Sequence, residues 1–337
     1  EPTRTSTTEP TLEPPPTARP TRQMAGETPT AVPTIWPKST TPTAVPGAIA
    51  RSHIEYITTE IGARPAGSAA EMQAADYIQT VLRDIGYTVE RQPFTKIGWV
   101  GEDEIETRIA SANVLATKAG ESEEIIVIGA HYDSVDTALG ADDNASGVGV
   151  LLELAETFYD TPTRYTLRFV AFGAEEVGPL GSAAYVEQLS AIERENTIAM
   201  INLDSVMAGD RLYVYSGEGR ETAVRDWALD WATHNGFNLQ TIQHVNLDDE
   251  DGYPTADYGA FQDAGIPFAY FEATNWTLGK RDGYTQVERS YGNNGAIIHT
   301  VYDRLDYLDE VFPGRVDEQL NAVVSIVKAI VSSWGTA

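Results

Sequence analysis

Two short apolar runs most constrain what this chain can fold into. Residues 125–129 and 166–172 are almost wholly apolar, which is typical of central strands covered on both faces of a sheet. Each run is followed by side chains that can bind a metal ion: His131 and Asp133 after the first, Glu175 and Glu176 after the second. Open α/β sheets form their sites at the carboxyl ends of strands. The runs therefore predict an α/β protein with a metal site where these strands end.

Strand-like and helix-like patterns alternate from residue 48 onward, and this alternation predicts the α/β class. We expect a single domain over residues 48–337, with a central mixed, mostly parallel twisted sheet covered by helices on both faces. Strand patterns occupy residues 88–94, 104–116, 124–129, 165–172, 198–203 and 267–271. Helix patterns occupy residues 48–61, 69–85, 145–159, 180–189, 222–235, 256–263 and 317–334.

The first 47 residues have a different composition from the rest of the chain. They hold 11 of the 18 prolines and almost no periodic apolar residues. Such a segment buries too little apolar surface to offset the entropy of ordering it, so residues 1–47 are predicted to be a disordered Pro/Thr-rich stalk. Tracts of this kind usually lie outside the cell. We therefore expect an extracellular or cell-surface protein, secreted and tethered through the stalk.

The charge of the chain limits the partners of the folded part. The net charge is −27, and the stalk contributes none of it because its four acidic and four basic residues cancel. A domain with this much negative charge repels nucleic acid and anionic membranes, so no nucleic-acid partner is expected. No apolar run reaches the roughly 18 residues that span a bilayer, so no membrane insertion is expected. The absence of cysteine excludes a thiol nucleophile and a Cys-rich zinc site.

A glycine-flanked turn, G-A-D-D-N-A-S-G, lies between the two apolar runs and opens a helix-like segment. Asp142 in this turn is predicted to bind metal, whereas Asp143 and Asn144 are expected to cap the helix. Five side chains then complete a predicted two-metal site: His131, Asp142, Glu176, Asp204 and His299. Three carboxylates and one hydroxide balance the charge of two Zn²⁺ ions, which allows the cluster to be buried.

Five motifs follow one another in the order H-Y-D-S-V, G-A-D-D-N-A-S-G, G-A-E-E-V-G-P-L-G-S, I-N-L-D and H-T-V-Y-D. In this order they resemble the M28 family of zinc aminopeptidases, which includes bacterial secreted leucyl-type enzymes. The resemblance covers roughly residues 48–335. It implies an exopeptidase that hydrolyses the N-terminal residue from peptides with a free N-terminus. It also implies two Zn²⁺ per chain, for which Co²⁺ or Mn²⁺ can substitute.

The resemblance also assigns roles to the predicted ligands. It implies that His131 and Asp204 hold one zinc, that Glu176 and His299 hold the other, and that Asp142 bridges both. A metal-bound imidazole commonly donates its second N–H to a carboxylate, which fixes its tautomer. Asp133 is placed two residues after His131 for this purpose. Asp303 is predicted to do the same for His299.

Glu175 is predicted to be the general base that takes the proton of the zinc-activated water. Adjacent residues leaving a strand point to opposite sides, so Glu176 can bind metal while Glu175 addresses the water. Where family members often carry Ser-Asp-His, this chain has Ala256-Asp257-Tyr258. Tyr253 stands four residues before that aspartate, the spacing at which some members place a tyrosine that stabilises the oxyanion. Tyr253 is accordingly predicted to be catalytic.

Three other functions are considered for a chain with these motifs. The resemblance implies that glutaminyl cyclisation also occurs on this scaffold, with a single zinc, and the full set of five predicted ligands argues against it here. A metallocarboxypeptidase or dipeptidase on the same fold would need a fixed cation for the substrate carboxylate, and Lys280, Arg281 and Arg289 are the candidates. A catalytically inactive binding ectodomain is disfavoured because the predicted ligands and Glu175 are all present. Oligomeric state and side-chain preference are not determined by the sequence.

Overall fold

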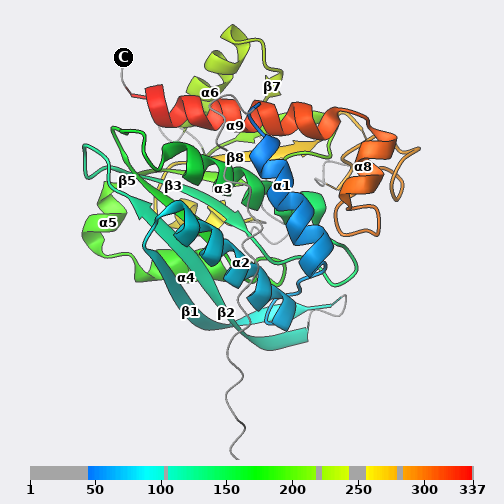
Figure 1. Ribbon diagram of the computed structural model, residues 1–337, viewed down its shortest axis with the longest axis horizontal. Helices are drawn as coiled ribbons and strands as arrows, with labels where there is room; N and C mark the ends of the chain where they lie inside the picture. Colours follow the sequence, from blue (N-terminus) through cyan, green and yellow to red (C-terminus); the bar gives the residue numbers. More distant parts are fainter. Residues whose placement is uncertain (1–44, 102–104, 218–221, 243–255, 279–283, 336–337) are drawn as a thin grey trace, which may run out of the picture. The chain divides into compact units, whose positions relative to one another are not determined.

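A mixed sheet forms the centre of the folded part of the chain (Figure 1). The computed structural model describes residues 45–101, 105–217, 222–242, 256–278 and 284–335, so the predicted stalk lies almost wholly outside the described residues. In these residues the sheet has eight strands in the order β1-β2-β4-β3-β5-β8-β6-β7. The strands are β1 (Val89–Val100), β2 (Ile105–Lys118), β3 (Ile125–His131), β4 (Thr166–Phe172), β5 (Thr197–Leu203), β6 (Arg211–Tyr215), β7 (Leu239–Gln240) and β8 (Phe268–Thr274).

The four central strands run parallel to one another, and antiparallel pairs flank them. β3 pairs with β4 and with β5 in parallel, and β5 pairs with β8 in parallel. The β1–β2, β2–β4 and β6–β8 pairs are antiparallel. The carboxyl ends of β3, β4 and β5 therefore lie side by side, and the two apolar runs form the neighbouring parallel strands β3 and β4.

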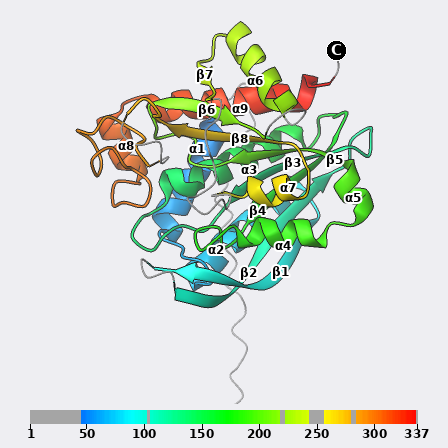
Figure 2. The same cartoon turned by 180° about the vertical axis from the view of Figure 1, so that it is seen from behind.

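Helices cover both faces of this sheet (Figures 1 and 2). Helices α1, α2, α3 and α9 pack together on one face, while α4 and α7 pack together on the other. Their bounds, with those of the remaining helical elements, are α1 (Ala48–Tyr56), η1 (Ile57–Ile61), α2 (Ala69–Ile85), η2 (Ala141–Ser146), α3 (Gly147–Phe158), α4 (Leu180–Gln188), α5 (Ala191–Asn196), α6 (Ala223–His234), α7 (Tyr258–Asp263), α8 (Leu305–Val311) and α9 (Arg315–Ser333). The predicted α/β class is confirmed.

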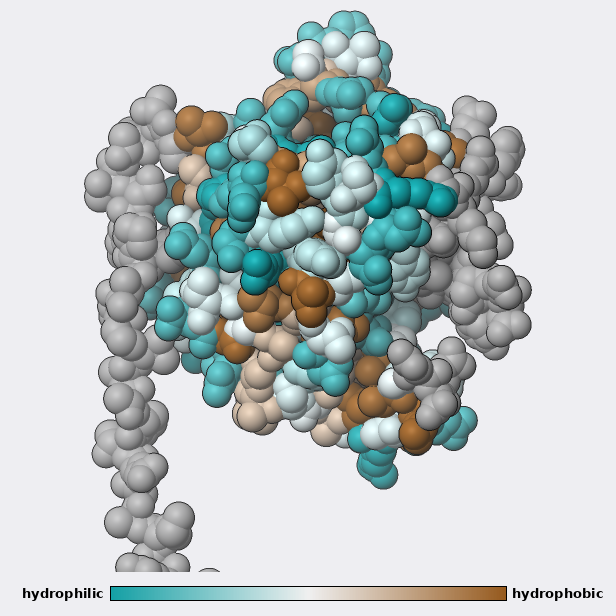
Figure 3. Space-filling view, turned by 90° about the vertical axis from the view of Figure 1, so that its right-hand side faces the viewer, coloured by the Kyte–Doolittle hydropathy of each residue, from teal (hydrophilic) through white to brown (hydrophobic). Residues whose placement is uncertain are grey.

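Burial explains why the central strands read as continuous apolar runs. Every residue of β3 is buried, because this strand lies in the middle of the sheet and between the helical layers. Helix α3 is nearly as buried, since it packs on β3 and is itself covered by α1 and α9. The surface is different: on the face drawn in Figure 3, hydrophobic residues form patches among hydrophilic ones. Among the described residues, no helix has the length and apolar character needed to cross a membrane.

Several elements were not anticipated from the pattern. Strand β1 continues beyond the expected residue 94 to Val100 because it pairs with β2 along its whole length. The N–H of Trp99 also donates to the carbonyl of Val177 at 2.9 Å, which ties the end of the hairpin to the segment after β4. Elements α5, β6, β7 and α8 are short and carry too few residues to show a period, so only tertiary pairing identifies them.

Candidate metal centre

The predicted ligands gather where the central parallel strands end. His131 is the last residue of β3, Asp204 follows β5, and Glu175 and Glu176 follow β4 after a two-residue turn. Ala174 in that turn has φ +56°, in the left-handed region, and the N–H groups of Glu175 and Glu176 then donate to Asp133, two residues after His131. The parallel register therefore brings side chains from three separate motifs to one place.

The first group of donor atoms comprises His131, Asp143 and Asp204. Nε2 of His131 lies 3.1 Å from Oδ1 of Asp143 and 3.3 Å from Oδ1 of Asp204. One nitrogen or oxygen from each residue lies within 4.8 Å of the others, and all three residues are buried. This spacing leaves room for one metal ion among an imidazole and two carboxylates.

The second group comprises Asp143, Glu176 and His299. Nε2 of His299 lies 3.0 Å from Oδ2 of Asp143 and 3.0 Å from Oε2 of Glu176. These donor atoms also lie within 4.8 Å of one another. Asp143 thus presents one carboxylate oxygen to each group, which is the arrangement expected of a residue that bridges two metal ions.

The structure places Asp143, and not Asp142, between the two groups. The prediction that Asp142 bridges and Asp143 caps a helix is therefore corrected. The backbone of Asp143 is non-helical, with φ −111° and ψ 94°, and this conformation turns its carboxylate into the site. Asn144 acts as the cap, since its Oδ1 accepts the N–H of Gly147 at 2.9 Å at the start of α3. Neighbouring residues in such a turn point in different directions, and composition alone does not indicate which one faces the metals.

Asp142 instead ties together two loops behind the site. Its Oδ1 accepts the N–H groups of Met207 at 2.8 Å and Ala208 at 3.2 Å, in the loop that follows Asp204. Its Oδ2 accepts from the amide of Gln286 at 3.2 Å. The Oε1 of Gln286 in turn accepts the N–H of Ile298 at 2.8 Å, directly before His299. Both carboxylate oxygens of Asp142 therefore accept hydrogen bonds from these two loops.

Asp133 and Asp303 both support the donor groups, but in different ways from each other. Oδ1 of Asp133 lies 3.5 Å from Nδ1 of His131, but Nδ1 has no hydrogen-bond partner among the described residues, so the N–H bond predicted for this pair is not formed. Asp303 does not contact His299 as predicted. It accepts the backbone N–H groups of Asp142 at 2.6 Å and Asp143 at 3.2 Å. The carboxylate of Asp303 therefore holds the backbone of the turn that carries Asp143.

Glu175 lies beside the first group without belonging to either group. Its Oε2 is 3.9 Å from Nε2 of His131. Its backbone N–H donates to Oδ1 of Asp133 at 2.9 Å, which fixes its place after β4. Tyr253 lies outside the described residues, as do Lys280 and Arg281, while Arg289 is exposed.

Burial and charge strongly perturb the ionisable groups of the metal-free site. Burial raises the pKa of Glu175 well above its usual range and that of Glu176 to about 7. Burial favours neutral imidazoles, but nearby carboxylates outweigh it: the pKa of His131 is raised well above its ordinary value, and that of His299 to about 12. The imidazoles therefore serve as cations among carboxylates when no metal is bound, a combination typical of functional sites.

The donor chemistry fits a pair of borderline divalent ions. Each group offers one imidazole nitrogen and carboxylate oxygens, a set that suits Zn²⁺ and also accepts Co²⁺ or Mn²⁺. Asp143 supplies a shared carboxylate, and Glu175 remains uncommitted beside the site. The two groups therefore offer two candidate sets of metal donors, with the carboxylate of Glu175 beside them.

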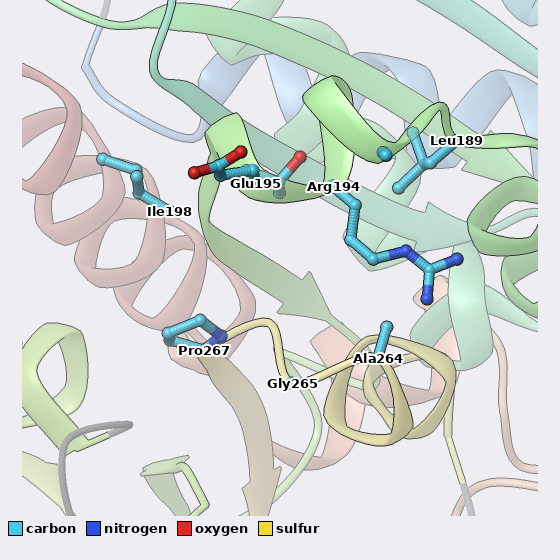
Figure 4. A pocket seen from close by; sticks show the side chains of 9 residues that line it. Leu189, Arg194, Glu195, Ile198, Ala264, Gly265 and Pro267 are labelled. Atoms are coloured by element: carbon cyan, nitrogen blue, oxygen red, sulfur yellow. The ribbon is translucent and has the colours of Figure 1, made fainter.

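A separate groove lies at the opposite ends of the same strands. It is lined at the start of β5 by Thr197 and Ile198, and at the start of β8 by Pro267. Figure 4 shows Arg194 and Glu195 beside the apolar side chains of this groove. The residues that line it include none of the candidate ligands, so it is distinct from the metal centre.

Comparison with known proteins gives the family. The model of peptidase family M28 matches residues 113–324, which include the described candidate ligands of both groups. The chain therefore belongs to peptidase family M28 and is a metallopeptidase of the aminopeptidase type.

Two relatives match different shares of the chain. The alkaline phosphatase isozyme conversion protein of Escherichia coli is 33% identical over 317 residues, which cover 86% of this chain and 91% of that protein. Aminopeptidase YwaD of Bacillus subtilis is 34% identical over 236 residues, or 65% of this chain and 50% of that protein. The chain thus spans nearly all of the first relative but about half of the second.

Solved structures share the fold. BSAP, a zinc aminopeptidase from Bacillus subtilis, superimposes with a TM-score of 0.67 at 20% identity, covering 86% of this chain and 96% of that chain. A glutaminyl cyclase from Porphyromonas gingivalis superimposes with a TM-score of 0.62 at 21% identity, covering 85% and 97%. The fold therefore serves both hydrolysis and cyclisation, and the site must distinguish them.

Proposed function

We propose that this protein is a two-zinc exopeptidase that hydrolyses the N-terminal residue from peptides. The observation that carries the proposal is the position of Asp143, whose two oxygens lie 3.1 Å and 3.0 Å from the imidazoles of two separate donor groups. In the proposed assignment, His131 and Asp204 would hold one ion, Glu176 and His299 would hold the other, and Asp143 would be shared between them. Co²⁺ and Mn²⁺ are alternative occupants.

Two bound zinc ions would supply Lewis acidity for the scissile carbonyl and an acidified water molecule for its hydrolysis. The neighbouring residue Asp133 fixes the positions of the two glutamates. Asp133 accepts the N–H groups of Glu175 and Glu176 on separate oxygens, at 2.9 Å and 3.1 Å, so both glutamates are fixed relative to the end of β3. Fixed placement of this kind lowers the entropic cost of reaching the transition state.

Glu175 is proposed to be the general base and then the general acid. Its side chain is only 10% exposed and lies close to the donor groups without being one of their members. It would take a proton from the attacking water and pass it to the leaving amine. Burial raises its pKa in the metal-free protein, and two cations nearby would lower it again toward the range that a base needs at neutral pH.

A free α-ammonium is the substrate group that this environment favours. Asp204 and Glu175 lie at one side of the site, and the rest of the folded chain is strongly acidic. A cationic amino terminus would be attracted to these carboxylates, whereas a terminal carboxylate would be repelled. The clamp that a carboxypeptidase needs is not found among the described residues near the donor groups, where the buried Arg64 is already bonded to backbone carbonyls.

We propose that the enzyme acts outside the cell and is tethered through its N-terminal Pro/Thr-rich segment. The composition of residues 1–47 supports this proposal. One relative, from Mycobacterium tuberculosis, is named a probable lipoprotein aminopeptidase, and it is 38% identical over 164 residues. Free peptides outside the cytoplasm would then be the substrates.

The decisive experiment compares substrates that differ only at their ends. Purified protein loaded with zinc is given aminoacyl chromogenic amides, the same compounds acetylated at the N-terminus, and peptides amidated at the C-terminus. We expect acetylation to abolish cleavage, with a loss of about 2–5 kcal/mol in transition-state binding, and amidation to change little. Cleavage of acetylated peptides at full rate, with amidated ones resisting, would establish a carboxypeptidase. Cyclisation of N-terminal glutamine without hydrolysis would establish a cyclase.

A further inference from the structure

A buried arginine contacts the loops that carry the candidate ligands. Arg64 follows η1 in the segment that leads to α2, and its side chain is completely buried. Burying a guanidinium is costly unless each of its N–H groups finds an acceptor. An arginine at such a position is therefore held for a reason other than surface solubility.

The guanidinium bonds to the backbone of the loops that carry the predicted ligands. Its Nε donates to the carbonyl of Tyr132 at 2.6 Å, directly after His131. Its Nη1 donates to the carbonyl of Leu139 at 2.7 Å, and its Nη2 to that of Gly140 at 2.9 Å, close before Asp143 in the chain. One planar group thus joins the loop after β3 to the turn that carries the shared carboxylate.

The turn is closely fitted around this arginine. Gly140 has φ +61°, and a Cβ there would lie 2.4 Å from the carbonyl oxygen of Asp143 and 3.0 Å from Nη1 of Arg64. Only glycine fits such an approach without a shift of the backbone. The turn therefore has little freedom to move once Arg64 is in place.

Arg64 also places a positive charge behind the carboxylates. Asp303, Asp133, Asp143 and Glu176 all interact with it electrostatically, although the hydrogen bonds described for its guanidinium go to carbonyls. A fixed cation at this depth lowers the repulsion among carboxylates without competing with the metals for their oxygens.

Glu71, at the other end of the same segment, holds the loop that follows β4. Glu71, in the first turn of α2, is buried. Its Oε1 accepts the N–H of Ala174 at 3.0 Å, directly before Glu175, and the hydroxyl of Ser111 at 2.5 Å. Its Oε2 accepts the N–H of Gly67 at 2.6 Å. Glu71 thus fixes the left-handed residue that turns the chain after β4.

We propose that Arg64 and Glu71 are positioning residues that set the metal affinity and geometry of the site from beneath it. Arg64 holds carbonyls of the two loops that carry His131 and Asp143, and Glu71 holds an N–H of the loop that carries Glu175. We call the segment 64–71 the bracket, because its two end residues hold the three loops in fixed positions relative to one another. This inference rests on the proposed two-metal function.

The test uses the full chain, made metal-free and titrated with Zn²⁺ against a competing chelator. The variants are Arg64→Met, Arg64→Lys and Glu71→Gln. Loss of outer-shell partners typically costs about 10- to 100-fold in metal affinity, and we expect this loss for Arg64→Met and Glu71→Gln. Arg64→Lys should fall between wild type and Arg64→Met, because lysine keeps the charge but not the planar set of donors. The visible spectrum of the Co²⁺-loaded variants should shift, and kcat should fall with little change in KM.

Glu153→Gln is the matched control. Glu153 is also buried, and its two oxygens accept the N–H groups of Gly47 at 2.9 Å and Ala50 at 2.8 Å, which belong to none of the ligand loops. In both variants the new amide group faces a backbone donor, so both should lower the melting temperature of the metal-free protein. Only Glu71→Gln should alter zinc affinity and the Co²⁺ spectrum.

The outcomes separate the inference from the proposed function. Wild-type protein that binds no metal would overturn the proposed function itself. Wild-type binding of two ions, with unchanged affinity and spectrum in Arg64→Met and Glu71→Gln, would overturn the positioning role. If Arg64→Met does not fold, Arg64→Lys and Glu71→Gln decide by the same readouts.

Discussion

Asp133 accepts the backbone N–H of Glu175 at 2.9 Å, and this bond joins the ends of two neighbouring parallel strands. Asp133 follows β3 and Glu175 follows β4, so the position of the proposed base is set by the strand that delivers His131. The carboxylate of Glu175 can therefore be altered while its backbone remains held. This separation makes the role of the side chain testable.

Glu175→Gln should keep both metals and lose most of its activity. An amide has nearly the same shape as the carboxylate but cannot accept the proton of the water, and general-base catalysis contributes about 10²- to 10⁴-fold. We expect kcat to fall by that factor while metal content, measured by elemental analysis, stays at the wild-type value. A variant that retains more than about a tenth of the activity would exclude Glu175 as the base.

Replacement of Asp143 and of Asp142 should have different consequences. Asp143→Ala removes the carboxylate that lies between both donor groups, so it should lose both metal ions together with activity. Asp142→Asn should mainly lower thermal stability, because Asp142 accepts the N–H groups of Met207 and Ala208. Metal content by elemental analysis and melting temperature measure the two effects.

The variants Asp143→Ala and Asp142→Asn serve as controls for each other. Each variant changes one aspartate in the same turn, so a general disturbance of the turn would affect both alike. Two tightly bound metals per chain in Asp143→Ala would contradict the shared-ligand assignment. Loss of metal in Asp142→Asn alone would restore the assignment made from the sequence.

The sequence predicted the strands and the motifs better than the direction of individual side chains. The runs that became β3 and β4 are apolar because both of their faces are covered, and this pattern is visible without a structure. The choice between Asp142 and Asp143 depends on the dihedral angles of one turn, which composition does not encode. Asp303 was expected at His299, but the fold places it against the backbone of the turn.

The bracket of Arg64 and Glu71 was not anticipated at all. Nothing in the local sequence A-R-P-A-G-S indicates that an arginine is buried, because surface arginines are far more common. Its partners are backbone carbonyls, which every residue possesses, so no complementary side chain marks the contact. Only the tertiary structure shows which carbonyl groups the guanidinium of Arg64 contacts.

His53 should make the folded state sensitive to acid. It is buried in α1, its Nδ1 lies 2.7 Å from the hydroxyl of Tyr77, and burial lowers its pKa to about 3. Because this pKa is below the ordinary value of 6.5, the unfolded chain binds the proton first as pH falls. The contribution of His53 to stability is therefore present above pH 6.5 and is lost progressively toward pH 3.

The effect can be isolated by comparing wild type with His53→Gln, which keeps a polar partner for Tyr77 but does not titrate. Between about pH 5.5 and 4.5 the wild-type free energy of unfolding should fall by about 1.4 kcal/mol more than that of the variant. Urea denaturation at each pH measures the difference. If the free energy of unfolding fell equally with pH in the two proteins, His53 would not be held neutral in the folded state.

Metal binding should release protons from the two imidazoles of the site. In the metal-free protein the pKa of His299 is raised to about 12, and that of His131 also lies well above its ordinary value. Both are therefore protonated at neutral pH, whereas a metal ligand must be a neutral imidazole. Binding of two zinc ions should then release about two protons, and a further fraction from Glu176, whose pKa is about 7.

The sign follows from competition between protons and metal for the same nitrogen atoms. As pH falls, metal affinity should weaken by about tenfold per pH unit for each proton released. Calorimetric titration of Zn²⁺ in buffers with different heats of ionisation counts the protons. His299→Gln should release about one proton fewer, while His234→Gln should match wild type because His234 is exposed on α6, remote in sequence from the ligand loops. Binding of two ions without proton release would mean that the imidazoles are already neutral, and the carboxylate-paired arrangement of the metal-free site would be wrong.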